Sequence, residues 1–593
     1  MQGAIEEGRL RRLLSSVKRP SRYIGGEWGS GPVKEGEDLV RICYAFPDLY
    51  EVGMSYLGFQ ILYPLTKSLP YADAERVYTP WPDMEAAMRD SGTPIWALES
   101  KRPLADFDAV GFTLQYELSY TNILTILDLA GIPFRSSERG EEHPLILAGG
   151  IGALAPEPVA PFIDAFMLGD GEVLIPEVLK CLHGLKGAKR AEKLAALAAI
   201  EGVYVPALYD GSKKIRRRIA EDLDGAFYHT SMIVPNTGIV HDRVAVQVFK
   251  GCTRGCRFCQ AGIIDRPLRE RSAESVCEQV KGLLASTGWE EVGLLSLATC
   301  DWNGLPEAME KFAPMLADNQ IKLSLPSLRV DAFSVNLAAG LESMRKGGLT
   351  FAPEAGTQRL RDVINKGVTD EAIEAALDET FSHGWDRVKL YFMMGLPTET
   401  AEDLAGILEI CNRAVSIAKR HRRRGDVNAS VAGFVPKAHT PFQWEAQASI
   451  AELRERGRGL KSSLKNRKVS LSYHEPEQTF LEGVFARGDS RLAAAVEEAW
   501  RRGARFDGWT EYFNFDLWTA VFADLGIDAA GYTAARGVDD KLPWDHIDCG
   551  VTKDFLLRER EKALAAVTTD DCRGGCNGCG WQGRTKAKGC PHV

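Results

Sequence analysis

The pattern of apolar and polar positions divides this chain into two strand–helix series and a helical stretch. In the first series, short apolar runs at residues 39–45, 108–113, 144–149 and 163–168 alternate with helical patterns, and glycines follow several of them. This alternation predicts an open, mostly parallel Rossmann-like sheet that binds ligands at the carboxyl ends of its strands. We assign this sheet to residues 1–195.

A second series follows a bridge at residues 196–240 that is expected to be β-rich. Its six apolar runs lie at residues 244–249, 292–297, 321–325, 349–351, 388–392 and 430–434. Six βα units favour a partial (β/α)6 barrel over a doubly wound sheet, although periodicity alone does not separate them. The predicted α/β fold therefore has a barrel at 241–450, a helical region at 451–541 and a small cysteine-rich tail at 542–593.

Composition agrees with a large globular protein. A chain of 593 residues predicts about four domains, and 45% hydrophobic with 26% charged residues excludes disordered and collagen-like classes. The sequence has no apolar run long enough to span a bilayer, and its charged N-terminus lacks the core of a signal peptide, so we expect a cytoplasmic protein without a membrane partner. The net charge of −9 argues against a surface that coats nucleic acid.

Thirteen cysteines are the most informative feature of the composition. In a reducing cytosol they are not expected to form disulfides, and an odd number excludes complete pairing. Eight of them gather in two groups, which points to metal. The isolated ones are expected to be structural thiols: Cys43, Cys181, Cys277, Cys300 and Cys411.

The first group directly follows the first strand of the second series. Cys252, Cys256 and Cys259 form a C-x3-C-x2-C loop, whose thiolates can bind three irons of one 4Fe–4S cluster and leave the fourth iron open. Zinc would need a fourth ligand nearby, and no His or Cys follows at the spacing of a zinc finger. Phe258 is expected to shield the cluster from solvent.

This motif resembles that of the radical S-adenosylmethionine (SAM) superfamily. The resemblance is strongest to the branch with an N-terminal cobalamin-binding-type domain, and within it to an uncharacterised fused family with a cysteine-rich C-terminal extension. Segments 266–272, 326–331, 352–357 and 394–399 look like the elements that follow successive barrel strands, and Trp544–Asp548 looks like an element of that family's extension.

The resemblance implies a specific chemistry. The open iron would chelate the amino and carboxylate groups of SAM, and a reduced cluster would cleave SAM into methionine and a 5′-deoxyadenosyl radical. A carrier such as flavodoxin or ferredoxin would donate the electron. By position, Ser327, Arg329 and Glu354 are expected to contact SAM, although each can equally be a polar cap at a strand end.

The turn after the first strand is the position at which cobalamin-binding domains provide a ligand to cobalt. Cobalamin domains carry Asp-x-His-x-x-Gly there; Asp48 and Gly53 match, but Tyr50 replaces the His that ligates cobalt, and a neutral phenol is a weak ligand. Either cobalamin binds without a protein ligand, or the sheet has kept its shape and lost the cofactor. Other turns that resemble that domain, and that can also be purely structural, contain Gly149, Gly150, Gly169 and Gly171.

The C-terminal group repeats the spacing of the first. Cys572, Cys576 and Cys579, with Cys590 or Cys549 as a fourth ligand, predict a second 4Fe–4S cluster. An open iron there would hold substrate or a transferable sulfur, whereas full ligation would indicate a structural or electron-transfer centre. The rival is a zinc site, which leaves Cys572 unused and has the ligands Cys576, Cys579, Cys590 and His592.

Other polar motifs give weaker signals. His439, His474 and His546 are candidates for acid–base chemistry, but a lone His more often makes a structural hydrogen bond. The basic runs 213–218 and 419–424 can bind RNA phosphates or form solvated surfaces beside acidic residues.

The function expected from the sequence is therefore radical modification of an unactivated carbon, with methyl transfer as the leading reaction. Methylthiolation or sulfur insertion on RNA or protein, using the second cluster, is the alternative within enzymes. A non-catalytic iron–sulfur redox sensor is the alternative outside them. The substrate can be a small molecule, RNA or protein, and no catalytic side chain is assigned.

Overall fold

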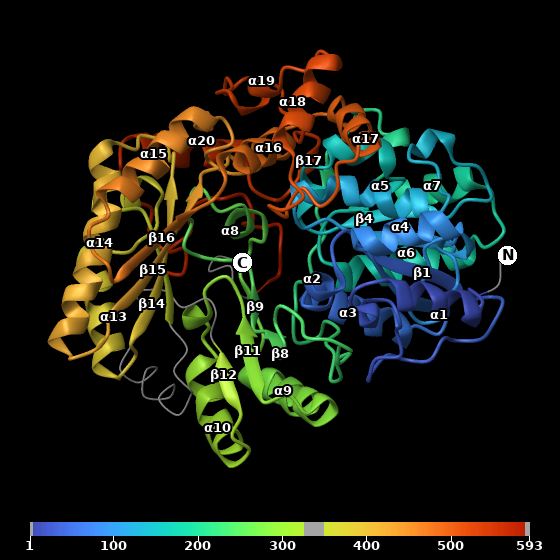
Figure 1. The fold of residues 1–593 in the computed structure, drawn as a ribbon, viewed down its shortest axis with the longest axis horizontal. Helices are drawn as coiled ribbons and strands as arrows, with labels where there is room; N and C mark the ends of the chain where they lie inside the picture. Colours follow the sequence, from blue (N-terminus) through green and yellow to red (C-terminus); the bar gives the residue numbers. More distant parts are fainter. Residues whose placement is uncertain (1–3, 325–348, 588–593) are drawn as a thin grey trace.

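The N-terminal sheet has the architecture that the strand pattern predicts. The structure is a computed structural model that describes residues 4–324 and 349–587 (Figure 1). The sheet order is β2-β1-β3-β4-β5-β6; the first five strands are parallel, and β6 is antiparallel to β5. Its first part is the flavodoxin-like order, with ligand sites expected at the strand ends. The strands are β1 (Val40–Phe46), β2 (Ala72–Tyr78), β3 (Ala109–Thr113), β4 (Leu145–Gly149), β5 (Ala165–Met167) and β6 (Val203–Tyr204).

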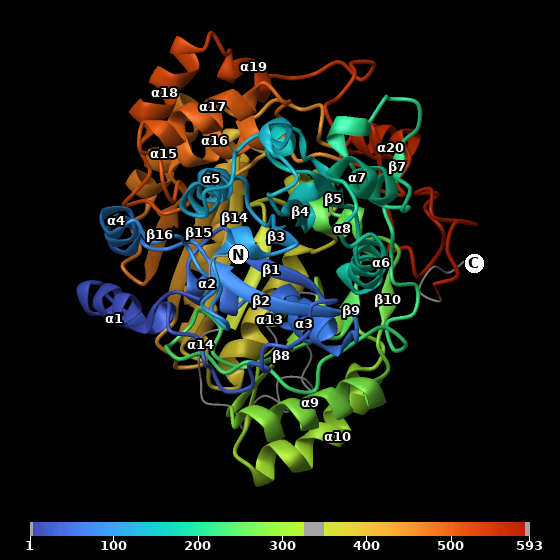
Figure 2. The same ribbon diagram turned by 90° about the vertical axis from the view of Figure 1, so that its right-hand side faces the viewer.

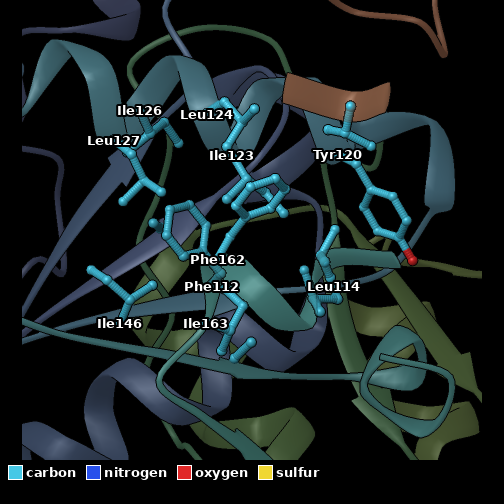
Figure 3. Packing of buried hydrophobic residues seen from close by; sticks show 14 of the residues in the cluster. Phe112, Leu114, Tyr120, Ile123, Leu124, Ile126, Leu127, Ile146, Phe162 and Ile163 are labelled. Atoms are coloured by element: carbon cyan, nitrogen blue, oxygen red, sulfur yellow. The ribbon is translucent and has the colours of Figure 1, made fainter. Parts of the chain in front are cut away.

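Both faces of this sheet are buried, which explains its nearly continuous apolar strands. Alternate residues enter different cores: Val110 and Ile146 face one, and Ala109 and Leu147 face the other. Figure 3 shows the first core, in which Ile146 lies near Leu127 of α5. The helices around the sheet are α1 (Glu7–Ser16), α2 (Tyr50–Met54), α3 (Leu57–Ser68), α4 (Pro82–Ser91), α5 (Tyr120–Leu129), α6 (Gly171–Gly184) and α7 (Arg190–Ala198).

The second series forms two parallel sheets with the orders β12-β11-β8 and β13-β14-β15-β16. Its helices lie outside the strands (Figure 1): α9 (Ala273–Thr287), α10 (Leu305–Asp318), α13 (Asp370–Ser382) and α14 (Ala401–Arg420). One hydrophobic core contains residues of both sheets, including Leu294 and Leu390. In the described ranges no strand pairing joins the two sheets, as in an open barrel. The strands are β8 (Val244–Gln247), β11 (Glu291–Leu295), β12 (Lys322–Ser324), β13 (Leu349–Glu354), β14 (Arg387–Met394), β15 (Asp426–Gly433) and β16 (Val469–Tyr473).

The prediction of a helical unit at 451–541 was wrong in two respects. β16 is a strand that pairs with β15, and α15 (Ile450–Ser463) packs in the barrel core with it. The run Val469–Tyr473 was missed because it is short and lies between helical patterns. Helices α16 (Pro476–Ala486), α17 (Leu492–Arg501) and α18 (Phe515–Asp524) instead share a core with the N-terminal sheet.

The bridge at 196–240 is not β-rich. Its strands are β6, which extends the N-terminal sheet, and the two-residue β7 (Ile215–Arg216), which pairs with β17 (Ile547–Asp548). Glycines and polar residues separate its apolar positions, so the segment crosses the surface of both neighbours without forming a sheet of its own. No helix in the described part of the chain is long and apolar enough to cross a bilayer.

The buried His229 in the bridge makes the unfolding free energy of the protein depend on pH under acidic conditions. Among the residues that the structure describes, neither of its buried ring nitrogens has a hydrogen-bond partner, and burial followed by Arg271 lowers the pKa of His229 to about 4. The unfolded chain binds this proton near pH 6.5, so the stabilisation is complete above that pH and is lost as the pH falls toward 4, by about 3 kcal/mol in all. We expect His229→Gln to reduce the loss of unfolding free energy between pH 7 and 5 in urea titrations. His474→Gln, at an exposed site, is the control, and an unchanged pH dependence in His229→Gln would contradict the assignment.

Candidate functional site

The three cysteines of the first motif lie in one loop between β9 (Phe249–Lys250) and α8 (Gln260–Ile264). The loop follows the carboxyl end of β8, the end at which barrel sites form. Cys259 precedes α8, and its Sγ accepts a hydrogen bond of 3.3 Å from the Gly262 amide. Burial, followed by the nearby Cys256 and Cys252, raises the pKa of Cys259 to about 12. The three sulfurs are thus close enough to interact, as an iron–sulfur cluster requires.

Glycines let the backbone pack closely around this loop. Gly251 has a φ of +88°, and a Cβ there would lie 2.6 Å from the Pro267 carbonyl oxygen. A Cβ at Gly262 would lie 3.3 Å from the Cys259 sulfur. Side chains at either position would therefore strain the loop or crowd the thiol.

Glu354 and an unexpected lysine lie beside the thiols. Glu354 ends β13 with a φ of +69°, a conformation that non-glycine residues rarely adopt. Its carboxylate lies 3.2 Å from Nζ of Lys366, and Lys366 also lies near enough to Cys259 to favour its thiolate. The contact of Glu354 with SAM stays a prediction, and Ser327 and Arg329 lie outside the described residues. Lys366 was missed, although the glycine that follows it marks a turn in the sequence.

Phe258 lies between two of the cysteines and is partly buried. Its ring packs against an apolar cluster that includes Leu360, Ile364 and Leu396. Its role in keeping water from a cluster stays a prediction.

The C-terminal cysteine motif lies against the first cysteine loop. The Cys572 amide donates to the Thr253 carbonyl at 3.2 Å, and the Thr253 hydroxyl donates to Asp571 at 2.9 Å. Arg254 forms an ion pair with Asp571 at 3.1 Å. The residues that follow Cys252 therefore hold the residues around Cys572. Figure 2 shows this tail at the edge of the molecule, near β7 and α20 (Lys553–Leu564).

Arg257 fastens the tail to the barrel. Its fully buried guanidinium pairs with Glu559 of α20 at 3.1 Å and donates to the carbonyls of Asp362, Val363 and Val567. The first cysteine loop, the helix after β13 and the C-terminal helix thus meet at one side chain. This role could not be predicted, because an arginine inside a cysteine motif resembles a solvent-exposed loop residue.

Asn365 forms a second connection between the first cysteine loop and the C-terminal tail. Its amide donates to the carbonyls of Arg254 and Thr569, and its side-chain oxygen accepts from the Thr569 amide. The side chain is buried, so these bonds are shielded from water. Asn365 thereby fixes the tail at the turn that contains Gly255.

The tail cysteines differ in exposure. Cys576 is exposed, whereas Cys572 and Cys579 are partly buried, and the Gly578 amide donates to the Cys576 sulfur at 3.3 Å. Cys590 and His592 lie outside the described residues. Among residues 4–324 and 349–587, no three His, Cys, Asp or Glu side chains converge as ligands of a single metal ion. A four-iron cluster differs from such a site because each thiolate binds a separate iron.

Cys549, the other candidate for the fourth ligand, is already engaged. It is buried, and its thiol hydrogen-bonds the imidazole of His439. Burial opposes ionisation, but His439 outweighs it and holds the pKa of Cys549 below its usual range. The other ring nitrogen of His439 lies 2.8 Å from the Leu154 carbonyl oxygen. Cluster ligation by Cys549 would therefore break a buried thiol–imidazole pair.

The remaining His and basic candidates mostly make structural contacts. Burial lowers the pKa of His546 to about 4, so its ring is neutral at pH 7. His474 is exposed beyond β16. In the two basic runs, several side chains pair with acidic residues, including Arg218 with Glu177 and His421 with Asp378. These pairs agree with a solvated surface in both runs.

Tyr50 does not fit the role of a cobalt ligand. Its hydroxyl donates to Glu27 at 3.0 Å and accepts from the Asn236 amide at 3.2 Å, and its ring is buried. Asp48 of the same turn accepts from the Trp509 indole at 3.0 Å, so the C-terminal part of the chain covers this strand end. Burial followed by Glu27 raises the pKa of Tyr50 and keeps the phenol neutral.

Most of the glycines with a predicted cobalamin role pack against protein. A Cβ added to four of them would meet another protein atom at distances from 1.8 Å, at Gly169, to 2.7 Å, at Gly171, with Gly53 and Gly150 between these values. Only at Gly149 is the nearest atom at an ordinary contact distance, 3.7 Å. Cobalamin contact by these glycines stays a prediction.

We expect Tyr50→Phe to destabilise the fold by about 1–3 kcal/mol, because it leaves Oε1 of the buried Glu27 without its hydroxyl donor, while Arg76 still holds Oε2. Tyr391→Phe removes a hydroxyl from an exposed ring and is the control. Urea unfolding measures both. A cobalamin absorption spectrum that changes on Tyr50→Phe, with no loss of stability, would instead place the phenol on cobalt.

Two family models match the chain. One, described as radical SAM proteins, N-terminal, matches residues 58–206, and the other, the radical SAM superfamily, matches residues 246–411, which include the first cysteine loop. The chain belongs to the radical SAM superfamily. It is therefore an enzyme, and membership implies a 4Fe–4S cluster and SAM, while their binding at Cys252, Cys256 and Cys259 stays a prediction.

Relatives of this radical SAM enzyme have diverse descriptions. An uncharacterized protein of Methanocaldococcus jannaschii is 28% identical over 440 residues, which cover 74% of this chain and 91% of that protein. Two proteins named ribosomal protein uS12 methylthiotransferase RimO match less: 23% identity with that of Desulfotalea psychrophila, over 51% of this chain and 66% of that one, and 21% with that of Treponema denticola, over 46% and 62%.

A solved structure of the cobalamin-dependent SAM radical enzyme OxsB, with aqua-cobalamin and SAM bound, is 14% identical to this radical SAM enzyme. The match covers 89% of this chain and 79% of that one, with a TM-score of 0.48.

Proposed function

We propose that this radical SAM enzyme cleaves SAM reductively and uses the resulting radical to modify an unactivated carbon of its substrate. The observation that carries the proposal is the loop of Cys252, Cys256 and Cys259 at the carboxyl end of β8, within the matched superfamily region. Three thiolates leave one iron of a 4Fe–4S cluster for SAM.

The residues around the loop suit this chemistry. When bound, the cluster supplies the electron that converts SAM to methionine and a 5′-deoxyadenosyl radical. Lys366 and Glu354 present a cation and an anion beside the thiols, which complement the carboxylate and amine of SAM. Phe258 and the apolar cluster behind it limit access of water, which protects a radical from side reactions.

Methyl is the group that we propose is added, since SAM itself carries a methyl group that can be transferred. The N-terminal sheet supports a ligand site at its strand ends through its flavodoxin-like order. Because Tyr50 is committed to Glu27 and Asn236, we derive no step through a cobalt ligand at that position.

Methylthiolation or sulfur insertion on RNA or protein is the second candidate. It is favoured by the contact between the two cysteine loops and by the two distant relatives named methylthiotransferases. In this case Cys572→Ala would abolish the sulfur-containing product while 5′-deoxyadenosine is still released. A Cys572→Ala variant that still forms both the sulfur-containing product and 5′-deoxyadenosine would exclude a sulfur donor in the tail.

An anaerobic reaction of the iron-loaded enzyme with SAM and dithionite tests the proposal. We expect 5′-deoxyadenosine and methionine to form, with S-adenosylhomocysteine as a further product where methyl is transferred. Separate quantification of the three products distinguishes radical formation from methyl transfer. Formation of 5′-deoxyadenosine no faster than without enzyme would contradict the proposal.

A further inference from the structure

We propose that the tail cysteines Cys572, Cys576 and Cys579 hold a second iron–sulfur centre that delivers electrons to the first. This role deepens the proposed function and rests on it, because reductive cleavage of SAM needs one electron per event. The donor would be a low-potential one-electron carrier protein of the flavodoxin or ferredoxin class. One electron passes from that carrier to the tail centre and then to the first centre, and no atom is transferred.

A direct bonded route connects the two cysteine loops. From Cys572 it runs through the backbone amide to the Thr253 carbonyl, across one hydrogen bond of 3.2 Å, and then along the chain to Cys252. The salt bridge from Arg254 to Asp571 and the Thr253–Asp571 hydrogen bond hold this contact in place. Electron transfer between adjacent centres benefits from such a short, rigid contact.

A second connection runs through one aromatic ring. The guanidinium carbons of Arg266 and Arg558 lie 5.1 and 6.0 Å from the centroid of the buried Phe555 ring. Nη2 of Arg266 lies 3.2 Å from the position of a Cβ on Gly255, in the first loop. Nη2 of Arg558 donates to the Gly578 carbonyl at 3.1 Å, in the tail loop. Both loops therefore contact cations that flank the same ring.

The burial of Arg266 and its unused hydrogen-bond donors indicate an anion in this region. Arg266 is only 3% exposed, and within the described ranges its Nε and Nη2 have no hydrogen-bond partner. A buried cation is costly unless an anion compensates it. Thiolate-ligated iron clusters supply negative charge, so a cluster on either side of Phe555 would complete the site.

The exposure of the two cysteine motifs favours electron transfer from the tail motif to the first loop. Cys576 is exposed, whereas the three cysteines of the first loop are partly buried. An external carrier therefore reaches the tail motif before it reaches the first loop. A sulfur donor would instead need its reactive sulfur on the side of the loop where SAM binds.

Reduction by two reductants tests this inference. The wild-type enzyme and the triple variant Cys572→Ala, Cys576→Ala, Cys579→Ala are loaded with iron and sulfide, and reduction of the first centre is followed by freeze-quench electron paramagnetic resonance (EPR). We expect iron to fall from about eight to about four per chain in the variant. The ratio of the rate with reduced flavodoxin to that with dithionite should fall at least about tenfold.

Several outcomes would overturn the inference. These are an unchanged rate ratio in a variant that has lost its tail iron, a tail that binds zinc, and iron content that does not depend on the tail cysteines. Because EPR follows reduction without turnover, an enzyme that transfers electrons but forms no 5′-deoxyadenosine would contradict the proposed function alone.

A conservative pair of variants separates electron transfer from folding. Arg558→Met removes the cation beside the tail loop, and we expect a more negative reduction potential for the tail centre and slower reduction by flavodoxin. Arg491→Met is the control, since Arg491 lies over the Tyr532 ring as Arg558 lies over the Phe555 ring, and its side chain is 75% exposed. Equal potentials in Arg558→Met and Arg491→Met would contradict a tail centre beside Gly578.

Discussion

Cys256→Ala is expected to abolish 5′-deoxyadenosine formation, to the level of a reaction without enzyme. Cys256 is one of three thiols that interact in the loop after β8, and two thiolates do not hold a cluster with one open iron in a defined position. Iron content should fall by about four per chain when a second centre is present. Iron analysis and product quantification under anaerobic conditions measure both effects.

Cys411→Ala is the matched control for this prediction. Cys411 is a fully buried thiol on α14, packed in the barrel core far along the chain from the loop. Its loss removes one sulfur from an apolar site, so stability should fall modestly while iron content and product formation stay near wild type. Activity in Cys256→Ala comparable to that of Cys411→Ala would rule out the first loop as the reactive centre.

Arg257→Ala is expected to cost about 3 kcal/mol in unfolding free energy, because it removes the guanidinium from the buried Glu559 carboxylate, which keeps only Lys562 and the Thr569 hydroxyl. It also removes donors to Val363 and Val567, which join the barrel to the tail. Local opening of the tail should precede global unfolding, so limited proteolysis should cleave after α20 at lower urea than in wild type.

An exposed arginine controls for the loss of charge and side-chain size. Arg11 of α1 pairs with Glu7 at the surface, with both side chains at least three-quarters exposed, so Arg11→Ala should leave stability nearly unchanged. A double variant, Arg257→Ala with Glu559→Leu, should recover part of the loss, since it removes the buried carboxylate that has lost the Arg257 guanidinium. Equal proteolysis of the Arg257→Ala and Arg11→Ala variants would show that Arg257 does not anchor the tail.

Local patterns predicted the N-terminal sheet, the strands of the barrel and the first cysteine loop. Strand alternation with helices identified the parallel N-terminal sheet, because both of its faces are buried and its apolar runs are nearly continuous. The spacing of Cys252, Cys256 and Cys259 on one loop after a strand defines a cluster motif within eight residues. Such features depend only on residues that are neighbours in the chain.

Contacts between distant segments could not be predicted in this way. The hydrogen bond from Cys572 to Thr253 and the roles of Arg257 and Asn365 depend on how the tail folds back onto the barrel. The burial of Tyr50 against Glu27 likewise needs the tertiary structure. The helical region was divided wrongly because one apolar face does not show which core it joins.

We expect the cluster held by Cys252, Cys256 and Cys259 to leave one iron open for SAM. Low-temperature EPR of the reduced, iron-loaded triple variant Cys572→Ala, Cys576→Ala, Cys579→Ala isolates that cluster, and SAM is then added. We predict that SAM shifts the g values of the cluster signal, as binding of its amine and carboxylate to an iron requires. A cluster signal that SAM leaves unchanged, in both this variant and the wild-type enzyme, would contradict the binding of SAM to an open iron.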